Sequence, residues 1–199
     1  MRVVFGFVLA LCVGVGACFG SAQAANSTQA NGRIVKLKIG DVAVLGKLQC
    51  RVFTNSPRHP IEYSHVQCSN GPLSKAAYSF VTNGFGTSVG IDVFQKGVSG
   101  AIYSTYQPPG KNQVANSAQP KGRIVRLRVG DVAVVLNGPG RHALVRVQCR
   151  AFSHASLRCS SGPLSKAPYY AGVTSAGINV YKKGSSAPIY STPAAATSG

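Results

Sequence analysis

The sequence has very few acidic residues. Its 199 residues include 21 lysines and arginines but only four acids: Asp41, Glu62, Asp92 and Asp131. This shortage excludes a charge-balanced surface. The resulting excess of positive charge costs stability by self-repulsion and attracts polyanions over long range. Because solubility alone requires a smaller net charge of either sign, we expect a polyanionic partner.

Tryptophan, long apolar runs and helical periodicity are also missing. The absence of tryptophan argues against a lectin that stacks sugars on indole rings. Beyond the N-terminal segment, no run approaches the roughly 20 apolar residues that a membrane-spanning helix needs. No stretch combines a sustained 3.6-residue apolar period with helix caps, which argues against helices.

The N-terminal segment, "MRVVFGFVLALCVGVGACFGSAQA", predicts a cleaved secretory signal peptide. A single cation, Arg2, precedes an apolar run from Val3 to about Ala17, and Ala22-Gln23-Ala24 has the small-x-small pattern of a cleavage site. Cleavage after residue 24 leaves 20 basic and 4 acidic residues, a net charge of +16. We expect an extracellular or periplasmic protein. Lipid anchorage at Cys18 is a less favoured alternative.

The rest of the chain is a duplication. "GRIVKLKIGDVAV" at Gly32 returns as "GRIVRLRVGDVAV" at Gly122, and "CSNGPLSKAAY" at Cys68 returns as "CSSGPLSKAPY" at Cys159. "AIYST" at Ala101 likewise answers "PIYST" at Pro188. We expect a signal peptide over 1–24, linkers over 25–31 and 109–121, homologous β domains over 32–108 and 122–193, and a disordered tail over 194–199.

Apolar and polar residues alternate in both copies, which predicts strands. Val35, Leu37 and Ile39 share one face, whereas Lys36 and Lys38 lie on the other. Other short β-rich runs are separated by glycine, proline and asparagine, as expected for turns. The predicted fold is all-β: two tandem, homologous, small antiparallel β-sandwiches or partly open barrels.

Four cysteines follow the predicted signal peptide: Cys50, Cys68, Cys149 and Cys159. An even number in an exported protein indicates disulfides. Since each copy contains two, we expect Cys50–Cys68 and Cys149–Cys159, one bond in each domain. No metal or cofactor is expected, because oxidised cysteines are not ligands.

The polar sides of the early strands provide the candidate binding surface. If the cationic strands of each copy pair as a hairpin, their outer faces form one basic sheet surface, suited to nucleic acid, a sulfated glycan, a wall polymer or anionic lipid. A half-exposed strand also needs polar residues simply for solvation. The candidate polyanion-binding residues are Lys36, Lys38, Lys47, Arg51, Arg126, Arg128, Arg146 and Arg150.

Nucleic acid is the less secure ligand at this stage, because single-strand binders usually place stacking aromatics among their cations. The alternating faces show no such aromatics. Tyr103 and Tyr190 in the repeated "IYST" are expected to be core or edge residues.

We therefore predict a secreted, non-enzymatic protein that binds an anionic polymer or surface by electrostatic docking. One alternative is a secreted effector or antimicrobial toxin that acts on anionic membranes. A less favoured alternative is a phosphodiester hydrolase that uses His59, Glu62 and His65 for acid–base chemistry.

Overall fold

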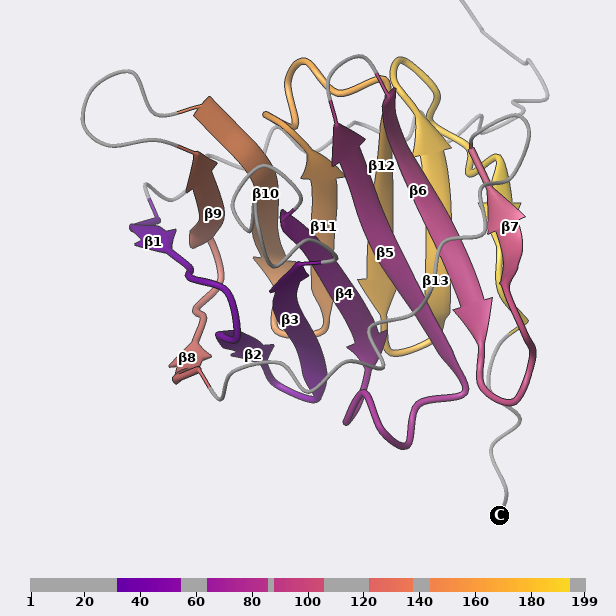
Figure 1. Cartoon of the computed structure of the whole chain (residues 1–199), viewed down its shortest axis with the longest axis horizontal. Helices are drawn as coiled ribbons and strands as arrows, with labels where there is room; N and C mark the ends of the chain where they lie inside the picture. Colours follow the sequence, from indigo (N-terminus) through magenta and orange to yellow (C-terminus); the bar gives the residue numbers. More distant parts are fainter. Residues whose placement is uncertain (1–31, 55–63, 86–87, 106–121, 138–143, 194–199) are drawn as a thin grey trace, which may run out of the picture.

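A computed structural model describes residues 32–54, 64–85, 88–105, 122–137 and 144–193. The predicted signal peptide, Cys18, His59, Glu62 and the predicted tail lie outside these residues. The regular structure of the described part consists of fourteen strands in two seven-stranded sheets (Figure 1). The all-β prediction is confirmed. The described ranges contain no helix long and apolar enough to cross a membrane.

Each copy contributes seven strands. Those of copy 1 are β1 (Ile34–Lys36), β2 (Val42–Leu45), β3 (Leu48–Thr54), β4 (Ser64–Asn70), β5 (Tyr78–Phe85), β6 (Ser88–Gln95) and β7 (Ala101–Ser104). Those of copy 2 are β8 (Ile124–Arg126), β9 (Val132–Asn137), β10 (Leu144–Ser153), β11 (Ser156–Ser161), β12 (Tyr169–Thr174), β13 (Gly177–Lys182) and β14 (Tyr190–Ser191).

The copies exchange their first strands. Sheet A has the order β1-β9-β10-β11-β12-β13-β14, and sheet B has the order β8-β2-β3-β4-β5-β6-β7. The strand β1 of copy 1 pairs in parallel with β9, while β8 of copy 2 pairs in parallel with β2. All other neighbours are antiparallel. Figure 1 shows β1, β2, β8 and β9 together at one end of the molecule.

The predicted alternation explains how the exchanged strands are held. Leu37 is buried, and Val35 and Ile39 pack against the same core, whereas Lys36 and Lys38 are exposed. The equivalent Leu127 is also buried. An apolar side chain at every second position gives each segment one face for the core and one for solvent.

One hydrophobic core lies between the two sheets. It contains buried residues of both copies, including Val52, Phe80, Leu157 and Val180. The expectation of two tandem domains is not confirmed, because each sheet takes an edge strand from the other copy. The two halves of the duplication instead enclose one interior.

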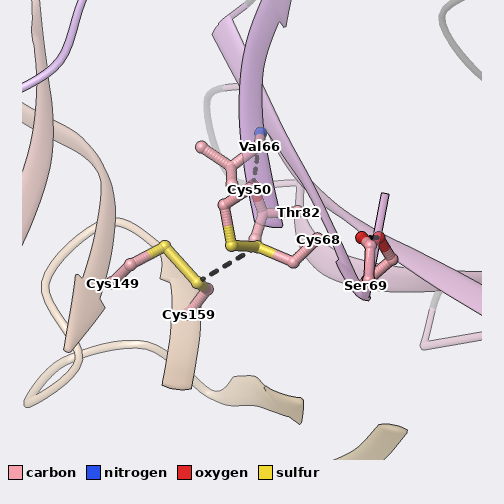
Figure 2. The surroundings of a disulfide bond; sticks show 8 residues. Cys50, Val66, Cys68, Ser69, Thr82, Cys149 and Cys159 are labelled. Atoms are coloured by element: carbon pink, nitrogen blue, oxygen red, sulfur yellow. Dashed lines mark hydrogen bonds between the residues drawn. A yellow bond between two sulfur atoms is a disulfide. The ribbon is translucent and has the colours of Figure 1, made fainter. Parts of the chain in front are cut away.

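The predicted disulfides are present at the centre of this core. Cys50 bonds to Cys68 and Cys149 to Cys159, each joining directly opposed residues of neighbouring strands. Figure 2 shows the two bonds facing each other, with Sγ of Cys68 3.6 Å from Sγ of Cys159. Since neither sulfur carries a hydrogen, this is a packing contact that joins the two sheets.

Candidate anion-binding surface

An arginine at the start of each exchanged strand fastens that strand to the other copy. Arg33 donates from Nε to Oδ2 of Asp131 at 2.9 Å and from Nη2 to the carbonyl of Arg126 at 2.8 Å. Arg123 donates from Nε to Oδ2 of Asp41 at 3.0 Å. We call the β1–β9 and β8–β2 contacts, together with these arginines and aspartates, the exchange seam.

Glycine is required beside each of these arginines. A Cβ on Gly32 would overlap the backbone of Gly130, and a Cβ on Gly122 would overlap that of Gly40. The Gly-Arg at the start of one repeated segment and the Gly-Asp in the second half of the other therefore form one inter-copy contact. Much of the repeated motif thus has a structural role.

The environment of the seam aspartates favours their ionised form. Burial raises the pKa of Asp41, but its hydrogen bonds outweigh this effect and hold the pKa below its usual value. The donors are the backbone N–H of Lys38, at 2.9 Å, and the backbone and guanidinium of Arg123. Equivalent donors lower the pKa of Asp131.

The described surface displays cations without exposed carboxylates. Asp41 and Asp131 are each 3% exposed and Asp92 is 0% exposed. The fourth acid, Glu62, lies outside the described residues. Over the ranges described, a docking polyanion meets no exposed side-chain carboxylate to repel it.

Four of the predicted cations lie at the exchange seam. Lys36 and Lys38 on one exchanged segment are exposed, as are Arg126 and Arg128 on the other. The two segments touch, since Nη2 of Arg123 donates to the carbonyl of Lys36 at 2.7 Å. The structure thus brings these cations to one end of the molecule.

The other four predicted cations lie on or beside β3 and β10. Lys47 is exposed in the turn between β2 and β3, whereas Arg51, Arg146 and Arg150 are half-buried. Nε of Arg51 and of Arg146 is buried without a hydrogen-bond partner. These two side chains are thus less available than an exposed lysine.

The expected hairpin within each copy does not form. Lys36 belongs to sheet A, whereas Arg51 belongs to sheet B, in which Lys47 lies in the turn that joins β2 to β3. The turn at Gly40 leads into β2, and β1 pairs with the other copy instead. Lys36 consequently shares a sheet with Arg150, not with Arg51.

Sheet A carries a group of basic and aromatic side chains, which we call the Arg–aromatic cluster. Arg150 and Arg158 are directly opposed on β10 and β11. The guanidinium carbon of Arg158 lies 4.6 Å from the ring centroid of Phe152, 5.4 Å from that of Tyr170 and 5.7 Å from that of Tyr181. That of Arg150 lies 5.9 Å from the ring of Phe152. These are cation–π distances.

A glycine lies beside this arrangement. Gly172 is the register partner of Arg158, and a Cβ there would touch both the Arg158 side chain and the Tyr181 ring. Tyr181 stacks on Tyr170, with ring centroids 4.9 Å apart and planes 11° apart. The rings therefore fix the position of the Arg158 guanidinium.

The guanidinium donors of the cluster have no acceptor in the part of the chain that the structure describes. Among the described residues, no carboxylate or carbonyl accepts a hydrogen bond from the guanidinium of Arg150 or Arg158. Like charges directly opposed across a sheet are destabilising. The cation–π contacts offset part of this cost and leave N–H edges available to an anion.

The corresponding face of copy 1 lacks this cluster. The register partner of Arg51 is a glutamine, and the equivalents of the two tyrosines are a serine and a phenylalanine. Phe152 is 41% exposed, but its counterpart is fully buried. The copy 1 equivalents are Arg51, Phe53, Gln67, Ser79 and Phe94.

Sequence reasoning named Arg150 but missed Arg158, Tyr170 and Tyr181. These residues lie on three different strands, and only the sheet register brings them together. The available signal was divergence between the copies, since "HVQCS" becomes "SLRCS" and "AAYSF" becomes "APYYA".

Other predicted residues have structural roles. Tyr103 and Tyr190 stack with centroids 4.2 Å apart and pack against the core, as expected. His65 is buried, and its Nδ1 donates to the carbonyl of Thr82 at 3.0 Å. Burial lowers the pKa of His65, although the Thr82 carbonyl and the Asp92 charge oppose this shift.

Among the described residues, the four cysteine sulfurs lie close enough together to be considered as metal ligands. They lie within 4.8 Å of one another. Each is bonded to another sulfur, so none is a free thiolate. In this oxidised form the group stabilises the core.

Comparisons with protein-family models, curated proteins and solved structures give no significant match. The surface of this protein is therefore what indicates its function.

Proposed function

We propose that this protein is secreted and binds an anionic polymer without catalysing a reaction. The observation that carries the proposal is the opposed pair of Arg150 and Arg158, whose guanidinium groups have no acceptor among the described residues. Two like charges in register cost stability. An anionic ligand that accepts hydrogen bonds from both would remove that cost.

Aromatic contacts prepare the pair for binding. A guanidinium held over rings keeps its N–H groups in the guanidinium plane, where a phosphate or sulfate can accept two parallel hydrogen bonds. Phe152 contacts both arginines, and Tyr170 and Tyr181 contact Arg158. Because these side chains are already ordered, binding loses less conformational entropy.

The exchange-seam cations supply the second part of the proposed mechanism. Lys36, Lys38, Arg126 and Arg128 are exposed, and a positive net charge of this size attracts a polyanion before contact. Lys36 lies on the edge strand of sheet A, two strands from Arg150. One polymer can then contact the seam and the cluster together.

Salt-dependent binding tests this function. The protein is applied to heparin and to immobilised single-stranded DNA and eluted with increasing salt. On DNA, each lost phosphate contact should reduce the slope of log affinity against log salt by about 0.7. Arg150→Gln with Arg158→Gln should give earlier elution from both matrices, as should serine at Lys36, Lys38, Arg126 and Arg128.

A matched control separates position from total charge. Serine at Lys75, Lys96, Lys166 and Lys183, all exposed and outside the proposed surface, removes the same charge as the four seam substitutions. If the control and seam variants elute together, the seam is not a binding surface. If the unmodified protein binds neither heparin nor single-stranded DNA, the proposed function is wrong.

A further inference from the structure

We propose that the anionic polymer is a single-stranded nucleic acid, with one base stacked on Phe152 and the adjoining phosphates held by Arg150 and Arg158. The inference rests on the proposed function and specifies its ligand. Its support is the combination, on one face of sheet A, of an exposed ring with two guanidinium groups that have no hydrogen-bond acceptor among the described residues.

The exposed ring favours a polymer that has aromatic bases. Phe152 is 41% exposed although it lies beside two arginines. Exposing a phenyl ring forgoes the free energy of burying it, and its copy 1 equivalent, Phe53, is fully buried. Stacking of an unpaired base on the ring recovers apolar contact and tolerates any sequence.

The same geometry disfavours a duplex and a sulfated glycan. In a duplex the bases stack on one another, so the protein meets mainly phosphates, and Phe152 adds nothing. A sulfated glycan satisfies the arginines but has no aromatic ring to stack. Single strands expose both groups, and in this cluster the ring of Phe152 lies beside both guanidinium groups.

Copy 1 supplies an internal reference for this site. Its Arg51 is opposed by Gln67, and its phenylalanine is buried. Arg158→Gln therefore recreates the copy 1 pair in copy 2, and Tyr170→Ser recreates the equivalent of Ser79 beside it. Both substitutions introduce residues that the same fold already accommodates.

Fluorescence anisotropy with labelled probes tests the inference at an ionic strength of about 0.15 M. The probes are oligothymidylate of about 15 nucleotides, an abasic strand with the same number of phosphates, a duplex of equal length, and heparin fragments. Oligothymidylate should bind the full-length protein at least about 5-fold more tightly than the abasic strand, as expected for one stacked base.

Two substitutions at one position separate stacking from apolar contact. Phe152→Leu keeps an apolar side chain but removes the ring, and Phe152→Ala removes both. Each should weaken oligothymidylate binding by about 5- to 150-fold, and should weaken abasic-strand and heparin binding by a clearly smaller factor, because loss of the ring also removes a contact that holds Arg150 and Arg158. Because Phe152 is partly exposed, both variants should fold, which unchanged urea unfolding verifies.

The outcomes discriminate between the proposals. Equal affinity for oligothymidylate and the abasic strand would overturn the single-strand assignment and leave polyanion binding intact. Tighter binding of heparin or duplex than of oligothymidylate would overturn it in favour of a charge-only ligand. Failure of all four probes to bind would overturn both proposals.

Discussion

Nε of Arg33 lies 2.9 Å from Oδ2 of Asp131, a residue 98 positions later in the chain. The equivalent contact joins Arg123 to Asp41, 82 positions apart. Together these contacts account for two of the four acids in the sequence. The repeated cationic segment therefore links the two copies as well as presenting charge.

Substitution of either seam arginine should destabilise the whole molecule. Arg33→Gln leaves Asp131 buried with one charged donor fewer, as Arg123→Gln does for Asp41. Hydrogen bonds to charged groups contribute about 1.5 to 3 kcal/mol, and because both arginines are half-exposed we expect about 1.5 kcal/mol. Urea unfolding measures this loss. Lys36→Gln is the control. It keeps the backbone carbonyl that accepts from Arg123, so it should change the free energy of unfolding little. If Lys36→Gln destabilised the protein as much as Arg33→Gln, the stabilising role given to the arginine would be wrong.

Alanine at Gly32 should act through steric overlap. The added Cβ meets the backbone of Gly130, so β1 can no longer pair with β9 without a shift. Overpacking of this kind typically costs about 1 to 3 kcal/mol, and Gly122→Ala should match it. Gly184→Ala is the control for backbone strain, since Gly184 has a φ of +83° and open space around it. If Gly32→Ala unfolds at the same urea concentration as the native protein, the close approach at the seam is not required.

Removal of both disulfides should lower the free energy of unfolding by an amount that differs from the sum of the two separate losses. Cys50→Ala with Cys68→Ala, and Cys149→Ala with Cys159→Ala, should each cost about 3 kcal/mol, because each removes a loop constraint on the unfolded chain. The contact between Sγ of Cys68 and Sγ of Cys159 couples the two disulfides across the sheets. In the quadruple variant, the loss of unfolding free energy measured with urea should therefore differ from the sum of the two separate losses by at least about 0.5 kcal/mol. Strict additivity would show that the contact carries no coupling.

Acidification below about pH 6.5 should weaken the fold through His65. Burial lowers the pKa of the folded imidazole, whereas in the unfolded chain it is about 6.5. Between the folded pKa and 6.5 the unfolded state binds the extra proton, so the free energy of unfolding falls as the pH falls, by at most about 1.4 kcal/mol per pH unit. Above pH 6.5 the effect is absent. Asp92 faces His65 and opposes part of the shift.

His65→Gln checks this pH dependence, because the glutamine amide can still donate to the carbonyl of Thr82. Urea unfolding across pH 5 to 7 should show a smaller slope for this variant. His154→Gln is the matched control, since His154 is exposed and its slope should equal that of the native protein. If the free energy of unfolding of His65→Gln depended on pH as steeply as that of the native protein, another group would be responsible for the pH dependence.

Local patterns predicted much of the fold. The alternation of Val35, Leu37 and Ile39 correctly separated core from solvent, and the even cysteine count with the duplication correctly paired Cys50 with Cys68. These features depend on residues near one another in sequence or on a repeat that restricts the choices. The alternation also placed Lys36 on the solvent side.

The exchange of strands was not predictable by the same reasoning. Both copies offer nearly identical apolar faces, so the alternation around Val35 does not by itself show that its neighbour is Ala133 of copy 2. The deciding contacts are long-range, between Arg33 and Asp131 and between Gly32 and Gly130. The Arg–aromatic cluster was missed for a similar reason, because a register across four strands assembles it.

The exchanged strands also impose an order on folding. β1 is made early but pairs only with β9, which follows some hundred residues later, so the edge of sheet A must wait for copy 2. Contacts this distant in sequence slow folding, because loop closure precedes their stabilising effect. A chain that ended after copy 1 would leave the edge of β2 unpaired and open to another chain. The second half of this protein thus completes the first, and synthesis of a single copy is expected to yield a self-associating product.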